Sequence, residues 1–207
     1  MRALLSILCL VVAGPGGVSG GAPDDSPIDW PAFLARNDLT WSAMPASWDE
    51  GGMLGNGLLG AMVYAAGDRR VVWELGRADV IDRRTEPADP MLARPRLPIG
   101  RLQLTTVGAI TGGSARLSLW DAEWTARVTT TAGALSIRSF VHAERPLLVI
   151  EVRSEGAERA AALAFIPDLA VNTRRLARRM PLAAADLNPA PFTEVAGDLR
   201  VSVQPRT

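Results

Sequence analysis

The sequence has very little of the chemistry on which many protein sites depend. It contains one cysteine, one histidine and no lysine among 207 residues. Cys9 lies in an apolar N-terminal run, so a mature chain without that run can form no disulfide, zinc-thiolate centre or cysteine nucleophile. His142 has no second histidine or cysteine with which to share a metal ion. We therefore expect neither a metal site nor a cofactor.

An excess of positive charge and a long apolar run are also lacking. The 22 basic residues are balanced by 22 acidic ones, so the formal net charge is zero. A nucleic-acid-binding protein needs a basic face for phosphate contacts, and this class is disfavoured. The apolar run Ala3 to Ala13 is too short to span a bilayer. We expect neither nucleic acid nor a membrane as a partner.

The N-terminus has the layout of a secretory signal peptide. Arg2 precedes the apolar run, and small residues follow it around Gly20 and Ala22. We predict a signal peptide at 1–22, a polar leader at 23–40 and a single domain at 41–207, exported to the bacterial periplasm or medium. The alternative for the apolar run is a buried first strand or helix.

Apolar and polar residues alternate through most of the chain, which is typical of half-buried antiparallel strands. Trp124 falls on the inward side of its segment, while two short stretches, Pro31 to Asn37 and Thr173 to Met180, favour brief helices. Phe140 and Val141 are adjacent apolar residues, so a β-bulge or bend is predicted near Ser139. The fold class predicted is all-β. Strands are expected at 58–64, 70–75, 100–106, 116–120, 123–129, 134–142, 148–153 and 198–203.

The most distinctive segment is WDEGGMLGNGLLGAM, from Trp48 to Met62. Its glycines precede a strand, whereas a phosphate loop requires strand, glycines and then helix, so nucleotide binding is disfavoured. Gly55-Asn56-Gly57 is consistent with a plain hairpin turn. Alternatively, the bare backbone approaches a neighbouring domain near a substrate cleft, with the Asn56 amide offered to a sugar hydroxyl.

This segment, LGNG-x-x-G-AM-V with a preceding Trp, resembles the opening of glycoside hydrolase family 95, the α-L-fucosidase and α-galactosidase-like group. Four later segments are similar to that family in the same order. They are VVWELGRADV at 71–80, LPIGRL at 97–102, LSLWDAE at 117–123, and FVH at 140–142 with PLLVI at 146–150. The sequence departs from the family pattern in two places. Met53-Leu54 stands where the family usually has Pro before the glycine turn, and residues 74–79 replace the frequent N-E-x-x-W segment.

The resemblance implies an antiparallel β-supersandwich, as in the N-terminal domain of the family 65 type. In such enzymes an (α/α)6 barrel follows and carries the catalytic residues. No segment here has the repeated amphipathic helices of that barrel. The expectation is therefore a truncated N-terminal domain without catalytic residues. Its expected partners are the C-terminal barrel and a carbohydrate. The alternative is a stand-alone β-sandwich that binds carbohydrate without cleaving it.

Four residues are candidates for contact with a sugar. Trp73 lies beside the polar Glu74 and Trp120 lies at a turn, so both are candidates for exposed positions, where an aromatic face can stack on a sugar ring. Asn56 and Glu74 offer hydrogen bonds to hydroxyl groups. For each Trp the alternative is packing in the core. The other carboxylates near Glu74 are expected to pair with neighbouring arginines and not to catalyse hydrolysis, which needs two carboxylates across the sugar.

Overall fold

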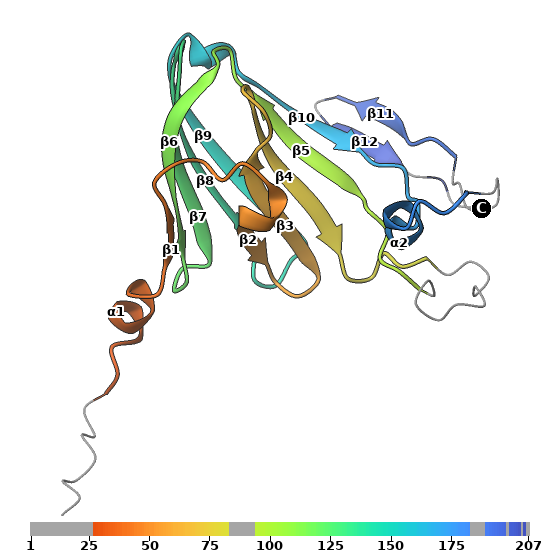
Figure 1. Cartoon of the computed structure of the whole chain (residues 1–207), viewed down its shortest axis with the longest axis horizontal. Helices are drawn as coiled ribbons and strands as arrows, with labels where there is room; N and C mark the ends of the chain where they lie inside the picture. Colours follow the sequence, from red (N-terminus) through yellow and green to blue (C-terminus); the bar gives the residue numbers. More distant parts are fainter. Residues whose placement is uncertain (1–26, 83–93, 183–188, 198, 204, 206–207) are drawn as a thin grey trace, which may run out of the picture.

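The computed structural model describes residues 27–82, 94–182, 189–197, 199–203 and 205. It consists mainly of two antiparallel five-stranded sheets packed face to face, which confirms the all-β sandwich (Figure 1). The predicted signal peptide, and the leader before residue 27, lie outside the described residues.

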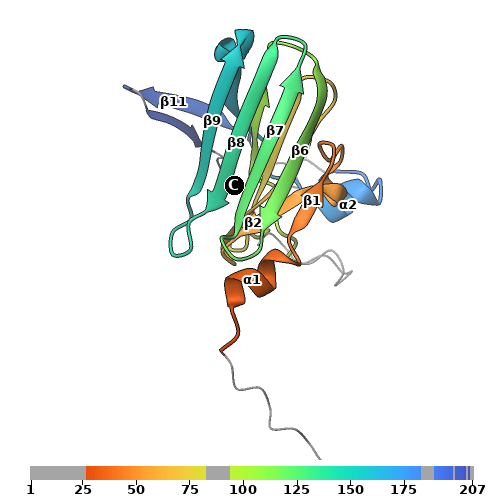
Figure 2. The ribbon, with the colours of Figure 1, turned by 90° about the vertical axis from the view of Figure 1, so that its left-hand side faces the viewer.

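Sheet A contains, in spatial order, β1, β6, β7, β8 and β9 (Figure 2). Their bounds are Leu39–Trp41, Ile110–Ser118, Glu123–Thr130, Gly133–Val141 and Leu148–Gly156. Sheet B contains β10, β5, β4, β3 and β2. Their bounds are Ala162–Pro167, Gly100–Thr105, Arg70–Arg77, Leu59–Ala65 and Gly52–Gly55. A separate hairpin pairs β11 (Phe192–Ala196) with β12 (Leu199–Val203).

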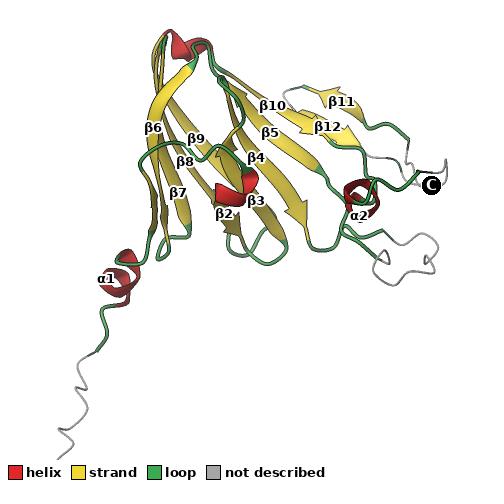
Figure 3. Cartoon of the chain, in the orientation of Figure 1, coloured by secondary structure: helices red, strands yellow, loops and turns green. Residues whose placement is uncertain are grey.

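Helices are short and lie outside the two sheets (Figure 3). They are α1 (Trp30–Ala35), α2 (Thr173–Ala177), and the 3-10 turns η1 (Trp48–Glu50) and η3 (Ala157–Ala160). Asp29 caps α1 by accepting a hydrogen bond from the Ala32 N–H, and Asn172 caps α2. Both predicted helical stretches are therefore confirmed, though each is shorter than expected. In the described part of the chain, no helix has the length and apolar character to cross a membrane.

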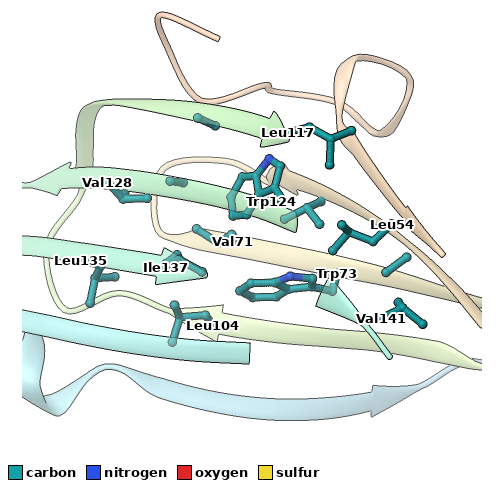
Figure 4. Packing of buried hydrophobic residues seen from close by; sticks show 14 of the residues in the cluster. Leu54, Val71, Trp73, Leu104, Leu117, Trp124, Val128, Leu135, Ile137 and Val141 are labelled. Carbon is teal, nitrogen blue, oxygen red and sulfur yellow. The ribbon is translucent and has the colours of Figure 1, made fainter. Parts of the chain in front are cut away.

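The alternating pattern places its apolar side chains between the sheets, where two tryptophans dominate the core (Figure 4). Trp73 on β4 and Trp124 on β7 are both fully buried. The prediction for Trp124 is confirmed, and for Trp73 the structure shows core packing and not the exposed position of a sugar-binding residue. Its neighbours Val71 and Val72 are also buried, so β4 is covered on both faces near its start.

The predicted bulge near Ser139 is also wrong. Strand β8 pairs with β9 in unbroken register from Gly133 to Val141, and Ser139 points into the core. The Trp73 Nε1–H donates to Ser139 Oγ at 3.1 Å, so the hydroxyl is matched to a buried donor. In the sequence, the polar Ser139 interrupts the alternation of apolar residues. In the structure the strand register is unbroken, and Ser139 is an inward-facing hydrogen-bond partner of Trp73.

A buried carboxylate fastens the end of the sandwich at which η3 lies. Glu158, on η3, is 1% exposed and accepts hydrogen bonds from the N–H groups of Val107 and Gly108 and from Thr130 Oγ1. Burial raises the pKa of Glu158, but the bonds from Thr130, Gly108 and Val107 outweigh it, so the pKa lies below its usual value. The loop after β5, the end of β7 and the turn after β9 are thereby joined.

Candidate functional site

A groove of about 700 Å³ lies at the end of the sandwich opposite η3. Its walls come from the β2–β3 hairpin, the end of β4, Arg96 and the turn between β6 and β7. Most of the lining is apolar, including the half-exposed Leu58 and Leu119 and the more exposed Met53. Charged groups on the wall are Glu74, Arg77 and Arg96.

Three glycines in register form part of the groove floor. Gly55 pairs with Gly60, and Gly60 pairs with Gly76, so β2, β3 and β4 each lack a side chain at the same level. A Cβ added at Gly76 would meet no heavy atom within 4 Å. The backbone is therefore open at Gly76, whereas a Cβ at Gly55 or Gly60 would contact a neighbouring backbone carbonyl oxygen, at 3.2 or 3.4 Å.

The glycine turn itself is a β-hairpin between β2 and β3. The Asn56 N–H donates to the Leu59 carbonyl at 3.1 Å, and Asn56 Oδ1 accepts from the N–H groups of Leu58 and Leu59. Gly57 has φ of +88°, a conformation that favours glycine. The hairpin reading of this segment is therefore what the structure shows.

The Asn56 side chain is fully occupied within the protein. Its Nδ2 donates to the carbonyls of His142 and Arg145, at 2.8 and 2.9 Å. With two bonds accepted at Oδ1, both donors and both acceptor positions of the amide are used. Asn56 fastens the β2–β3 turn to the β8–β9 turn, and no hydrogen-bonding capacity remains for a sugar hydroxyl.

Glu74 is exposed on the outer face of β4 and lines the groove. Its Oε2 accepts a hydrogen bond from the Tyr64 hydroxyl at 2.9 Å. Burial, together with this hydrogen bond, raises the pKa of Tyr64, so the hydroxyl remains a donor at neutral pH. The other carboxylate oxygen of Glu74, Oε1, forms no hydrogen bond with the described residues.

The carboxyl group of Asp168 lies close enough to Glu74 for their charges to interact. Burial raises the pKa of Asp168, Arg101 at 3.4 Å lowers it, and Glu74 raises it further, with a net upward shift. Asp168 is not part of the groove lining. Among the described residues that line the groove, Glu74 is the one carboxylate, and a single carboxylate does not make a hydrolytic pair.

The two candidate tryptophans have different environments. Trp120 is 52% exposed on the β6–β7 turn, in a segment whose Leu119 and Ala122 line the groove. Trp73 has no exposed surface and cannot stack on a sugar. Of the four candidates, the structure brings Glu74 into the groove and Asn56 and Trp120 to its margin, and it places Trp73 in the core.

The remaining carboxylates behave mostly as structural groups. Asp79 pairs with Arg77 at 2.7 Å, as expected from their spacing, and this contact raises the pKa of Arg77. Asp121 accepts from the Ser118 hydroxyl in the β6–β7 turn, and Glu123 pairs with Arg138 across sheet A. No group of three metal-ligating side chains is found among the described residues.

Several groove residues were not identified from sequence. Gly60 and Gly76 are separated by 16 positions and become neighbours only through strand register. Arg96 reaches the groove from beyond the segment 83–93, and Met53 lies on the unpredicted strand β2. The one available signal was Gly60 within the strand predicted at 58–64, since a glycine in a strand often marks close approach of another group.

No known family model matches the chain, and no curated protein shows significant similarity to it. The resemblance to family 95 therefore rests on the motifs quoted above. Three of their segments, 48–62, 71–80 and 117–123, provide nearly all of the groove lining.

Proposed function

We propose that this chain is a non-catalytic, carbohydrate-contacting β-sandwich domain of an exported glycoside hydrolase of the family 95 type. In this proposal the groove contributes one wall of the substrate cleft, and a separate helical barrel supplies the catalytic residues. The observation that carries the proposal is that segments far apart in sequence, which together carry the family resemblance, converge on one groove.

The chemistry of the groove supports a sugar more than other ligands. A sugar ring has apolar C–H faces and a rim of hydroxyls, which suit an apolar wall, an aromatic face and a few polar groups. The bare glycine floor, Trp120 and Glu74 offer these features. The wall that carries Glu74 also carries two residues of opposite charge, Arg77 and Arg96. The groove therefore does not strongly favour ligands of either charge.

Saccharide binding is tested by titrating the purified chain with fucose-, galactose- and oligosaccharide-containing ligands, followed by NMR or calorimetry. Gly76→Leu places a side chain in the open space of the floor and should abolish binding. Gly112→Leu, on β6, is the matched control, because a Cβ there also meets nothing within 4 Å but the residue lies outside the groove lining. Binding that survives Gly76→Leu, or is lost equally in both variants, contradicts the groove assignment.

Catalysis is tested separately with aryl α-L-fucosides and α-galactosides. The chain should give no turnover above background, because the groove holds one carboxylate where hydrolysis needs two groups. Turnover that disappears in Glu74→Gln would show that the chain itself is catalytic. The same assay on a longer gene product containing a helical barrel distinguishes an enzyme domain from a stand-alone binding module.

A further inference from the structure

The outer face of sheet A carries a second hollow, of about 440 Å³, which shares no lining residue with the groove. Figure 2 looks onto this face, where β6, β7, β8 and β9 lie side by side. Each of these four strands contributes one exposed arginine to the lining: Arg116, Arg127, Arg138 and Arg153. Glu151 is the one carboxylate among the described residues that line the hollow, so positive charge is in excess there. We call this lining the arginine face.

Strand register places a small hydroxyl side chain between the arginines of the arginine face. One cross-strand row contains, in order, Ser114, Arg127, Ser136 and Arg153, and the next contains Arg116, Thr125, Arg138 and Glu151. Neighbouring strands lie about 4.8 Å apart, so the backbones of two arginines in one row are separated by about 10 Å. The short Ser or Thr side chain between them leaves the space that forms the hollow, with a hydroxyl group at its base.

Carboxylates hold three of the four arginines in place. The pairs are Arg116 with Asp38, Arg127 with Glu155, and Arg138 with both Glu123 and Glu151. Each guanidinium has five N–H donors, so the pairs of Arg116 and Arg127 leave some donors unused. Arg153 forms no hydrogen bond or ion pair with the described part of the chain. The arginine face is thus a largely fixed set of cations with one whole guanidinium available.

We propose that the arginine face binds an acidic saccharide, a ligand whose carboxylates are spaced along a chain rich in hydroxyl groups. The planar guanidinium matches a carboxylate through two parallel hydrogen bonds, and Arg153 offers this fork without giving up a partner. The hydroxyls of Ser114, Thr125 and Ser136 can donate to and accept from sugar hydroxyls. The site lies outside the groove, so it does not depend on the groove ligand proposed above.

The distribution of charge favours a saccharide over a polymer of phosphates. When the ion-pair partners are included, four carboxylates lie among the four arginines. A densely charged chain would meet these carboxylates at close range and be repelled, and like charges at close range are costly. Carboxylates that are separated by neutral hydroxyl groups can approach the arginines and avoid that repulsion.

The first test is an NMR titration of the full chain with tetragalacturonate. Amide signals of β7, β8 and β9 should shift, and a neutral galactose tetrasaccharide should leave them unchanged. Arg153→Gln should weaken binding of tetragalacturonate by about tenfold or more, because hydrogen bonds between two charged groups are lost. Arg159→Gln is the matched control and should bind as the wild type does. Arg159, on η3, is also exposed and without a partner among the described residues, but it does not line the hollow.

The second test separates this site from the groove and from a general attraction between charges. Gly76→Leu alters the groove floor and should leave the affinity for tetragalacturonate unchanged, so failure of the groove assignment and failure of this site are distinguishable. A single-stranded oligonucleotide should bind more weakly than tetragalacturonate. The proposed site is overturned by an absence of shifts with tetragalacturonate, by an equal effect of Arg159→Gln, by equal shifts of β7 to β9 with the neutral tetrasaccharide, or by tighter binding of the oligonucleotide.

Discussion

Leu104 and Leu163 are direct cross-strand partners on the inner face of sheet B, yet their environments differ greatly. Leu104 is 3% exposed and Leu163 is 49% exposed. The two leucines occupy equivalent positions in two alternating strands, so alternation shows only which face a residue occupies. How deeply that face is buried depends on whether the opposite sheet reaches it. At the other side of the sandwich β2 contacts β6, β7 and β8, so the sheets close there, whereas Leu163 on β10 stays half exposed.

The largest effect should come from truncating the two leucines. Leu104→Ala should lower the free energy of unfolding by about 2–5 kcal/mol, because it leaves a cavity in packed surroundings. Leu163→Ala should cost about 1 kcal/mol, since roughly half of its apolar surface is already in water. Urea unfolding, monitored by tryptophan fluorescence at concentrations where the chain is monomeric, measures both. Equal losses of stability would mean that Leu163 is covered as fully as Leu104 within the monomer.

A substitution at Glu158 tests how much the buried carboxylate stabilises the end of the sandwich at which η3 lies. Glu158→Gln should lower stability by about 1.5–3 kcal/mol at neutral pH, the usual contribution of hydrogen bonds to a charged group. The pKa of the folded carboxyl is below its unfolded value of about 4.3, so its stabilisation is complete above that value. It is lost as pH falls through the lower folded pKa. The difference between wild type and Glu158→Gln should therefore shrink in acid, and a pH-independent difference contradicts the charged role.

Two glycine substitutions compare the core with the groove. A Cβ at Gly52 would lie 2.4 Å from Trp124 Cδ1, and the buried indole has little room to move, so Gly52→Ala should cost about 1–3 kcal/mol. Gly76→Ala meets only open space and should change stability by about 0.5 kcal/mol or less, in either direction. Thermal unfolding of both variants, at matched concentration, measures the contrast. An unchanged melting temperature for Gly52→Ala would contradict tight packing of Trp124 against β2.

The last prediction concerns Asn56. Asn56→Ala removes the bonds to the His142 and Arg145 carbonyls and should lower stability by about 1–2 kcal/mol, because these groups are partly exposed and water replaces some of the bonds. Saccharide binding by the folded fraction should be retained. A variant that keeps its stability but loses binding would restore the ligand-binding role considered for this side chain.

Much of the fold could be predicted because period-two alternation is a local property of the sequence. The segments that became β3 to β9 and β12 were found with boundaries mostly within a few residues, since each has its own apolar face. Strands β1, β2, β10 and β11 were not predicted as separate elements. They are short edge or hairpin strands, and β2, with two glycines in four residues, has little alternation to detect. The prediction of a bulge at Ser139 was wrong. From sequence alone, a polar residue on the inner face looks the same as a shift in the alternation, because its hydrogen-bond partner Trp73 is distant in the chain.

The candidate site was predicted less completely than the fold. Glu74 and Trp120 were chosen for residue type and position near turns, and they lie in or beside the groove. Trp73 was a candidate because its polar neighbour Glu74 is compatible with exposure, but Trp73 faces inward and packs in the core, which was the alternative for this residue. The glycine floor depends on which residues of β2, β3 and β4 face each other, and register is a property of paired strands.

By itself, the sequence determined the strand character of this protein, the inward side of most strands, and the confinement of its one cysteine to the N-terminal apolar run. These follow from side-chain alternation and composition, which require no knowledge of distant contacts. Only the tertiary structure decided that Asn56 holds two turns together, that Trp73 is paired with Ser139, and that Leu163 is left half exposed. Each of these outcomes depends on residues tens of positions apart, whose proximity is set by sheet order and by how the two sheets pack.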